Sequence, residues 1–306
     1  MKEDSIDVEG ASFLSEWKRR VREGFEILGP IRGPVLVITH LPVLLLEAVI
    51  CACAKWRLGH FPYILNHESA RADVAIAVGL NTTPYTVWPM GVFLNKVFGY
   101  RILFIQTPLE GNVVPSSEIV SLNRKWFREH TGQRPLYAIG FSYGGFDLIW
   151  QLVDLVKTHP DRDLRTLYTV NTPLRGSALA RVIKASGARE MEPDSENLPQ
   201  THRAIEHLEA HGVFVHHNAS FVDLVARKGD TRPPRPADSV VPSRWQRYVI
   251  WPALIVLSLW RWQPTLPTWW SHTLPQIGHK ATMNPLVWIV LGLRIRRSLK
   301  GTFLSS

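Results

Sequence analysis

The sequence predicts an α/β fold in which a mostly parallel sheet is covered by helices on both faces. Short apolar runs alternate with segments of helical periodicity from residue 73 onward, and such alternation is typical of right-handed βαβ crossovers. Hydrophobic residues make up 45% of the 306-residue chain and charged residues 20%, which is a globular composition. The chain can therefore bury a sizeable core, and a disordered or collagen-like protein is excluded.

Five apolar runs have the length and residue types of strands, and three segments between them have helical periodicity. The expected strands are residues 73–79, 100–106, 135–141, 166–171 and 212–218. The expected helices are residues 86–98, 117–131 and 143–158, the last two ending before Gly132 and Pro160. Strands joined by helices in this order predict a single α/β domain over residues 72–306.

The first 71 residues are expected to form a helical extension, with membrane association as one reading of its pattern. Residues 12–29 have the pattern of a basic amphipathic helix, which suits either a membrane surface or an ordinary surface helix of the protein. Residues 34–53 form an apolar run of spanning length, but a histidine, a proline and Glu47 interrupt it. A charge in mid-span is costly. The run is therefore expected to pack on the domain or lie in the membrane interface, although a true span stays open.

The expected strand 135–141 leads directly into the motif Gly140-Phe141-Ser142-Tyr143-Gly144, and a helical pattern follows. A serine nucleophile on a strand-to-helix turn needs small neighbours, because its backbone is strained and larger side chains would clash. Such a turn also aims the first amides of the helix at a developing oxyanion. The motif therefore predicts a nucleophile at Ser142 in an elbow formed with Gly140 and Gly144.

These residues resemble the α/β-hydrolase superfamily, and within it the bacterial triacylglycerol lipases and esterases. Residues 73–88 are similar to the lipase segment that carries a His-Gly pair, with Val78 in place of the histidine. Residues 171–180 are similar to the T-P-H-x-G-S stretch, with Leu174 in place of its histidine, and residues 191–195 resemble the turn before the cap. The resemblance implies that the amides of Leu80 and Tyr143 form an oxyanion hole.

A serine nucleophile needs a base and an acid, which follow it in the order acid, then histidine, in this superfamily. His279, in a segment similar to the family's G-H stretch before the last helix, is the expected base, and His272 is a nearby rival. Asp238 begins a stretch resembling the lipase D-G-x-V-P pattern, whereas Asp223 follows the strand 212–218 almost directly. The pattern favours Asp238 as the acid and leaves Asp223 open.

The chain combines a formal charge of +9, from 35 Lys and Arg against 26 Asp and Glu, with 12 Trp residues. Anionic membrane surfaces attract this combination, whereas no recognition motif supports a nucleic-acid partner. Six of the Trp residues lie in residues 245–270, around an apolar run too short to span a bilayer. This Trp-rich insert is expected to lie in the membrane interface beside the catalytic histidine, or to add to the core.

The sequence thus predicts a serine hydrolase that cleaves carboxylic esters of a hydrophobic or lipid substrate. Acyl transfer on the same scaffold is an alternative, and the missing family histidines leave open an inactive lipid-binding scaffold. No cofactor or metal is expected, since Cys51 and Cys53 have neither disulfide nor zinc-site spacing. The N-terminus lacks a secretory signal pattern, so a cytoplasmic or peripherally membrane-associated protein is expected.

Overall fold

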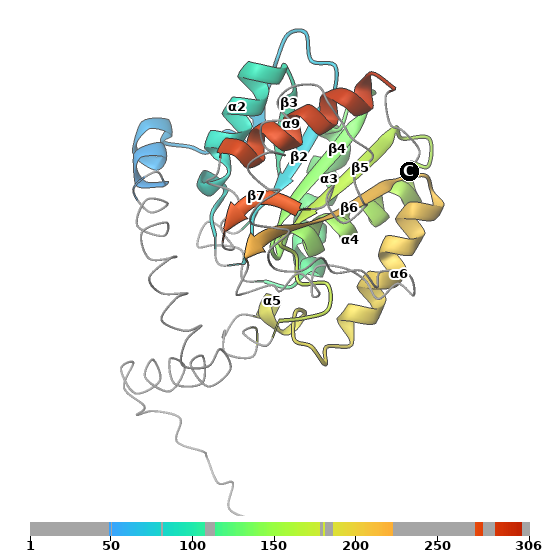
Figure 1. Cartoon of the computed structure of the whole chain (residues 1–306). Helices are drawn as coiled ribbons and strands as arrows, with labels where there is room; N and C mark the ends of the chain where they lie inside the picture. Colours follow the sequence, from blue (N-terminus) through green and yellow to red (C-terminus); the bar gives the residue numbers. More distant parts are fainter. Residues whose placement is uncertain are drawn as a thin grey trace, which may run out of the picture.

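The computed structural model describes residues 49, 51–80, 82–107, 114–177, 180, 186–222, 273–277 and 285–301 (Figure 1). They form a seven-stranded sheet with the order β1-β3-β2-β4-β5-β6-β7. The strands are β1 (Ile64–Leu65), β2 (Asp73–Ala77), β3 (Arg101–Phe104), β4 (Leu136–Phe141), β5 (Leu164–Val170), β6 (Phe214–Val222) and β7 (Thr273–Ile277). All neighbouring strands pair in parallel except β1, which pairs antiparallel with β3.

The chain passes from β2 to β3 on one side and then returns past β2 to β4 on the other side, so the direction of the connections reverses here. In open α/β sheets ligands bind outside the carboxyl ends of the strands at such a switch point. Every residue of β2 and of β4 is buried, as expected for central parallel strands with both faces covered. Two fully buried central strands therefore support the chain segments that follow Ala77 and Phe141.

Helices cover both faces of the sheet, as the sequence predicts (Figure 1). They are α2 (Trp88–Phe98), α3 (Ser116–His130), α4 (Gly144–Thr158), α5 (Ser186–Arg189), α6 (Asn197–Ala210) and α9 (Pro285–Leu299), with a short 3-10 turn η1 (Pro84–Thr86). One hydrophobic core contains residues of α3, α4 and α6, and the other contains residues of α2 and α9. The sheet separates the two cores, giving the three-layer α/β architecture.

Two buried tyrosines attach α9 to the sheet. The Tyr100 hydroxyl donates to the Gly292 carbonyl at 3.0 Å, and the Tyr137 hydroxyl donates to Ser298 Oγ at 2.9 Å. A Cβ at Gly292 would lie 2.4 Å from the Phe98 ring, so α2 and α9 approach closely at this glycine. Burial raises the pKa of both phenols, which keeps their hydroxyl groups protonated as donors.

The structure confirms the five expected strands and the three expected helices, with ends shifted by a few residues. It adds β1, β7, α5 and α6, which the sequence patterns did not indicate. Of the N-terminal extension, the structure describes only residue 49, which is helical, and the stretch from residue 51, where a helix ends at Leu58. The Trp-rich insert 245–270 lies outside the described residues. None of the helices that the structure describes is long and apolar enough to cross a membrane.

Candidate active site

Ser142 lies on a tight turn between β4 and α4, at the carboxyl edge of the sheet. Its φ of +50° is in the left-handed region, which costs a residue with a Cβ roughly 1 to 2 kcal/mol. The Ser142 amide donates to the Val170 carbonyl of β5 at 2.7 Å, and its carbonyl accepts from the Gly145 amide at 3.1 Å. These two bonds hold the strained backbone, and strain of this kind is concentrated at functional sites.

Three glycines around Ser142 have no room for a side chain. An added Cβ at Gly140 would lie 2.6 Å from the Gly145 Cα atom, and one at Gly144 would lie 2.4 Å from the Val78 carbonyl oxygen. At Gly145 it would lie 2.0 Å from Thr172 Oγ1. The turn is therefore as compact as the nucleophile-elbow motif requires, because β2, β4 and the segment after β5 all meet it closely.

The loop that follows β2 packs directly against Ser142. An added Cβ at Gly79 would lie 3.1 Å from Ser142 Cβ and 3.7 Å from its Oγ. Thr82 closes this loop, since its amide and its hydroxyl both donate to the Gly79 carbonyl, at 3.3 and 2.6 Å. Leu80, the expected first oxyanion donor, thus belongs to a loop that is fixed next to the serine at the switch point.

The second expected donor, the Tyr143 amide, lies at the start of α4. The helix begins at Gly144, and the first amides that bond back are those of Gly145, to Ser142, and Phe146, to Tyr143 at 2.9 Å. The first amides of a helix have no carbonyl partner within it, and the helix dipole favours negative charge there. The Tyr143 amide therefore belongs to the group that can bind an oxyanion.

Aliphatic core residues occupy the two positions at which the lipase pattern described above has histidine. Val78 is 1% exposed and packs in the core with α2 and α9, whereas Leu174 is fully buried in the core with α4 and α6. The Leu174 carbonyl accepts a hydrogen bond from His202 Nε2 at 2.6 Å. The side chains of Val78 and Leu174 thus fit their packed surroundings. The hydrogen bonds by which Thr82 closes the loop do not require a histidine at position 78.

The expected acid and base lie outside the described residues, and so do the rivals Asp223 and His272. The strands that precede them are described: β6 ends at Val222, directly before Asp223, and β7 ends at Ile277, two positions before His279 in the sequence. Both strands run parallel to β4. Their carboxyl ends therefore meet the same edge of the sheet as Ser142.

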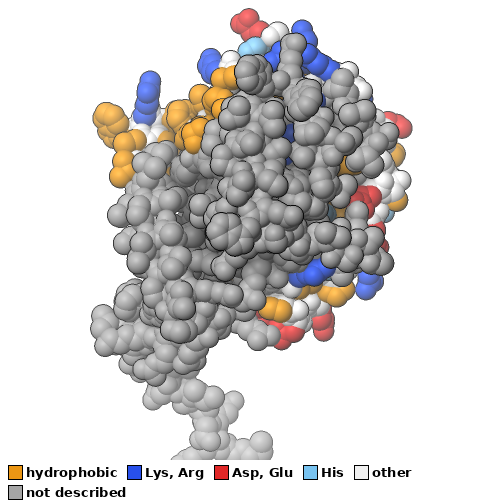
Figure 2. Space-filling view, in the orientation of Figure 1, with side chains coloured by type: hydrophobic (Ala, Val, Ile, Leu, Met, Phe, Trp, Pro, Cys, Tyr) orange, Lys and Arg blue, Asp and Glu red, His pale blue; other side chains and the backbone are white. Residues whose placement is uncertain are grey.

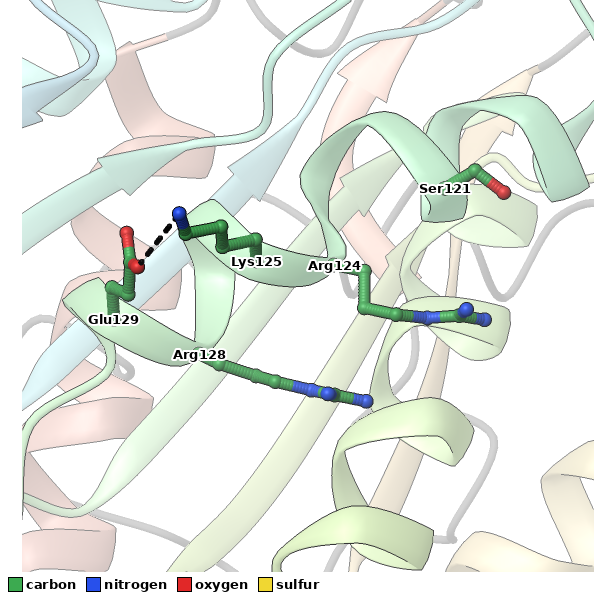
Figure 3. A pocket seen from close by; sticks show the side chains of 5 residues that line it. All are labelled: Ser121, Arg124, Lys125, Arg128 and Glu129. Atoms are coloured by element: carbon green, nitrogen blue, oxygen red, sulfur yellow. Dashed lines mark ion pairs between the residues drawn. The ribbon is translucent and has the colours of Figure 1, made fainter.

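Described residues line two surface pockets to which Ser142 does not contribute. One lies on α3 beside Ser121 and a group of charged residues (Figure 3). There Arg124 and Arg128 extend toward α4 and pair with Asp154, each at 3.1 Å. These ion pairs join the two helices, which gives Arg124 and Arg128 a structural role.

The other pocket lies between the loop after β5 and the start of α6. It is lined by Arg175, Pro193, Asp194, Ser195, Leu198, Pro199 and His202.

No family model and no curated protein matches this chain at a significant level. Several solved structures are similar to it at low identity. The lipase BlEst2 of Bacillus licheniformis in its mature form is 12% identical, with a TM-score of 0.43 over 79% of this chain and 98% of that chain. Phospholipase PlaB from Legionella pneumophila is 15% identical, with a TM-score of 0.41 over 49% of this chain and 39% of that chain. The metagenomic carboxyl esterase MGS0156 is 18% identical, with a TM-score of 0.36 over 52% of each chain.

The chain thus spans about two fifths of the phospholipase and about half of the esterase. The strand order, the switch point and the turn at Ser142 define the fold of this chain. Together these features give the described residues an α/β-hydrolase architecture, as the sequence resemblance implied.

Proposed function

We propose that this protein is a serine hydrolase that cleaves carboxylic esters of a hydrophobic or lipid substrate through an acyl-enzyme. One observation supports the proposal above all others: Ser142 has a φ of +50° on a strand-to-helix turn where three glycines leave no space for a Cβ. A structural turn could avoid this strain with a glycine in place of the serine. A nucleophilic serine cannot be replaced by glycine in this way, because its hydroxyl must stand above the sheet.

The proposed mechanism follows from the chemistry of the serine and its neighbours. His279 removes the Ser142 proton as Oγ attacks the ester carbonyl, and Asp238 orients the imidazole. The Leu80 and Tyr143 amides stabilise the negative charge on the tetrahedral intermediate. His279 then returns the proton to the leaving alcohol, and water cleaves the acyl-enzyme by the same steps.

The test is turnover of p-nitrophenyl esters of increasing acyl length by the whole chain, with and without glycerol as an acyl acceptor. We expect release of p-nitrophenol and of free fatty acid. The rate of release should increase from the acetyl ester to esters with longer acyl chains. Acylated glycerol in place of fatty acid would instead identify an acyltransferase. Absence of turnover at every length contradicts the proposal, and vesicle binding without turnover would favour an inactive lipid-binding scaffold.

We further propose that a membrane surface is the partner of this hydrolase, with the Trp-rich insert and the N-terminal region facing lipid. Among the described residues, the helix that ends at Leu58 supports this. Its Trp56 side chain is 89% exposed between the exposed Lys55 and Arg57. At the position that this helix has in Figure 1, Figure 2 shows hydrophobic and basic side chains next to one another. An exposed indole flanked by cations suits the headgroup region of an anionic bilayer.

Co-sedimentation with phosphatidylglycerol vesicles tests the membrane proposal. Replacing Lys55 and Arg57 by alanine is expected to weaken binding by about 1 kcal/mol per cation, and Trp56→Ala is expected to weaken it further. Vesicles of phosphatidylcholine alone should bind less. Leu122→Ala, which removes a half-exposed apolar side chain on α3, is the control. Equal binding by all variants would exclude this helix as a lipid contact.

A further inference from the structure

The side chain of Tyr143 is completely buried in the core that contains α3, α4 and α6. Its ring stacks on Phe146 with a centroid separation of 6.0 Å, and an added Cβ at Gly187 would lie 2.8 Å from the phenol oxygen. The hydroxyl is 2.9 Å from Glu190 Oε2, 3.0 Å from the Val114 carbonyl and 3.2 Å from Ser116 Oγ. The ring is thus held by packing along its length and by hydrogen bonds at its end.

Glu190 is the acceptor at the centre of these contacts and is only 9% exposed. Its carboxylate accepts from the Ser116 amide at 3.1 Å, from Ser116 Oγ at 2.7 Å and from the Tyr143 hydroxyl. Ser116 is the first residue of α3, and the amino end of a helix favours a negative charge. Three donors and a helix terminus compensate the burial of this carboxylate.

Burial raises the pKa of the Tyr143 phenol far above its ordinary value, and the charges of Asp147 and Glu190 act in the same direction. The hydroxyl is therefore protonated at neutral pH and can donate. A hydrogen bond from this hydroxyl to a buried carboxylate is directional, and charge-assisted bonds of this kind are stronger than neutral ones.

The network joins three segments that surround the nucleophile turn. Ser116 begins the helix that follows β3, Tyr143 follows the nucleophile at the end of β4, and Glu190 lies in the segment that follows β5. Fixing the Tyr143 ring fixes its Cα, and with it the direction of its amide. We propose that Glu190 is a positioning residue that acts through the Tyr143 hydroxyl to hold the Tyr143 amide toward the oxyanion. The proposal rests on the function proposed above.

The test compares Glu190→Gln and Tyr143→Phe with the matched control Tyr137→Phe. Tyr137 is also buried, and its change to phenylalanine also removes a side-chain hydrogen bond, but that bond is to Ser298 and attaches α9 to the sheet. For each protein we would measure kcat and KM with a p-nitrophenyl ester, the dissociation constant of an alkylboronic acid, and the thermal midpoint. Boronic acids imitate the tetrahedral intermediate, so their binding depends on the oxyanion donors.

We expect Glu190→Gln and Tyr143→Phe to lower kcat by roughly 10- to 100-fold with KM nearly unchanged, since a misplaced catalytic group has effects of this order. Boronate binding should weaken by the same factor, while Tyr137→Phe lowers the thermal midpoint and leaves kcat as in wild type. Ser116→Ala removes the hydroxyl that contacts Glu190 and Tyr143 but keeps the backbone amide that donates to Glu190. It should show a smaller fall in kcat in the same direction, and it replaces the other two variants if they do not fold.

Variants at positions 190, 143 and 116 that lower only the thermal midpoint, as Tyr137→Phe does, would overturn the inference while the proposed function stands. A rise in KM at constant kcat would also overturn it, because that result reports lost ground-state binding. Failure of the wild-type protein to turn over any ester would instead contradict the proposed function itself, and this inference with it. The wild-type measurement therefore separates the two failures.

Discussion

Replacing Ser142 by alanine is expected to lower kcat for the ester substrates by roughly a million-fold, the order seen when a catalytic nucleophile is removed. Labelling by a fluorophosphonate probe should disappear together with turnover, since only an activated serine reacts with it. Ser121→Ala, at an exposed position on α3, is the matched control and should label as wild type does. Equal labelling of wild type and Ser142→Ala would contradict the assignment of the nucleophile.

A second substitution at the same position separates function from strain. Glycine adopts a φ of +50° without cost, so Ser142→Gly should be inactive yet more stable than wild type by about 1 kcal/mol. Denaturant unfolding measures this difference. An inactive variant with unchanged or lower stability would indicate that the turn stores no strain at Ser142, and the backbone argument for a nucleophile would then fail.

Much of the fold follows from sequence periodicity because the central strands are buried on both faces. Val74, Ile76 and Ile139, for example, lie in continuous apolar runs that cannot be solvent-facing loops. There are clear physical reasons why the sequence patterns did not indicate two of the strands. β1 has only two residues, and β7 contains Pro275, which argues against a strand in any sequence-based prediction.

The candidate site was predictable only where its chemistry is local in sequence. Ser142 and its glycines form a contiguous motif, and the structure adds the reason for each glycine. Glu190, in contrast, contacts Tyr143 from 47 positions away along the chain. No periodicity or motif marks it, because its role depends on the way the segments after β3, β4 and β5 pack together. Long-range polar contacts of this kind require the fold.

The second large effect is expected at the acid of the triad. Asp238→Asn should lower kcat by about ten-thousand-fold, because an asparagine donates where the imidazole needs an acceptor and so favours the wrong tautomer. Asp223→Asn should be mild. The two changes are matched in chemistry and both residues follow β6 in the sequence, so ester turnover by the two purified variants measures their difference directly.

The topology alone does not favour Asp238 over Asp223, since β6 ends at Val222 and simple connections place the acid soon after its strand. The preference rests on the stretch Asp238-Ser239-Val240-Val241-Pro242, which resembles the lipase pattern. A large loss in Asp223→Asn with a mild effect of Asp238→Asn would move the acid to Asp223 and leave Ser142 in place. His279→Asn and His272→Asn extend the same logic to the base, since removal of the true base should cost about as much as removal of the nucleophile.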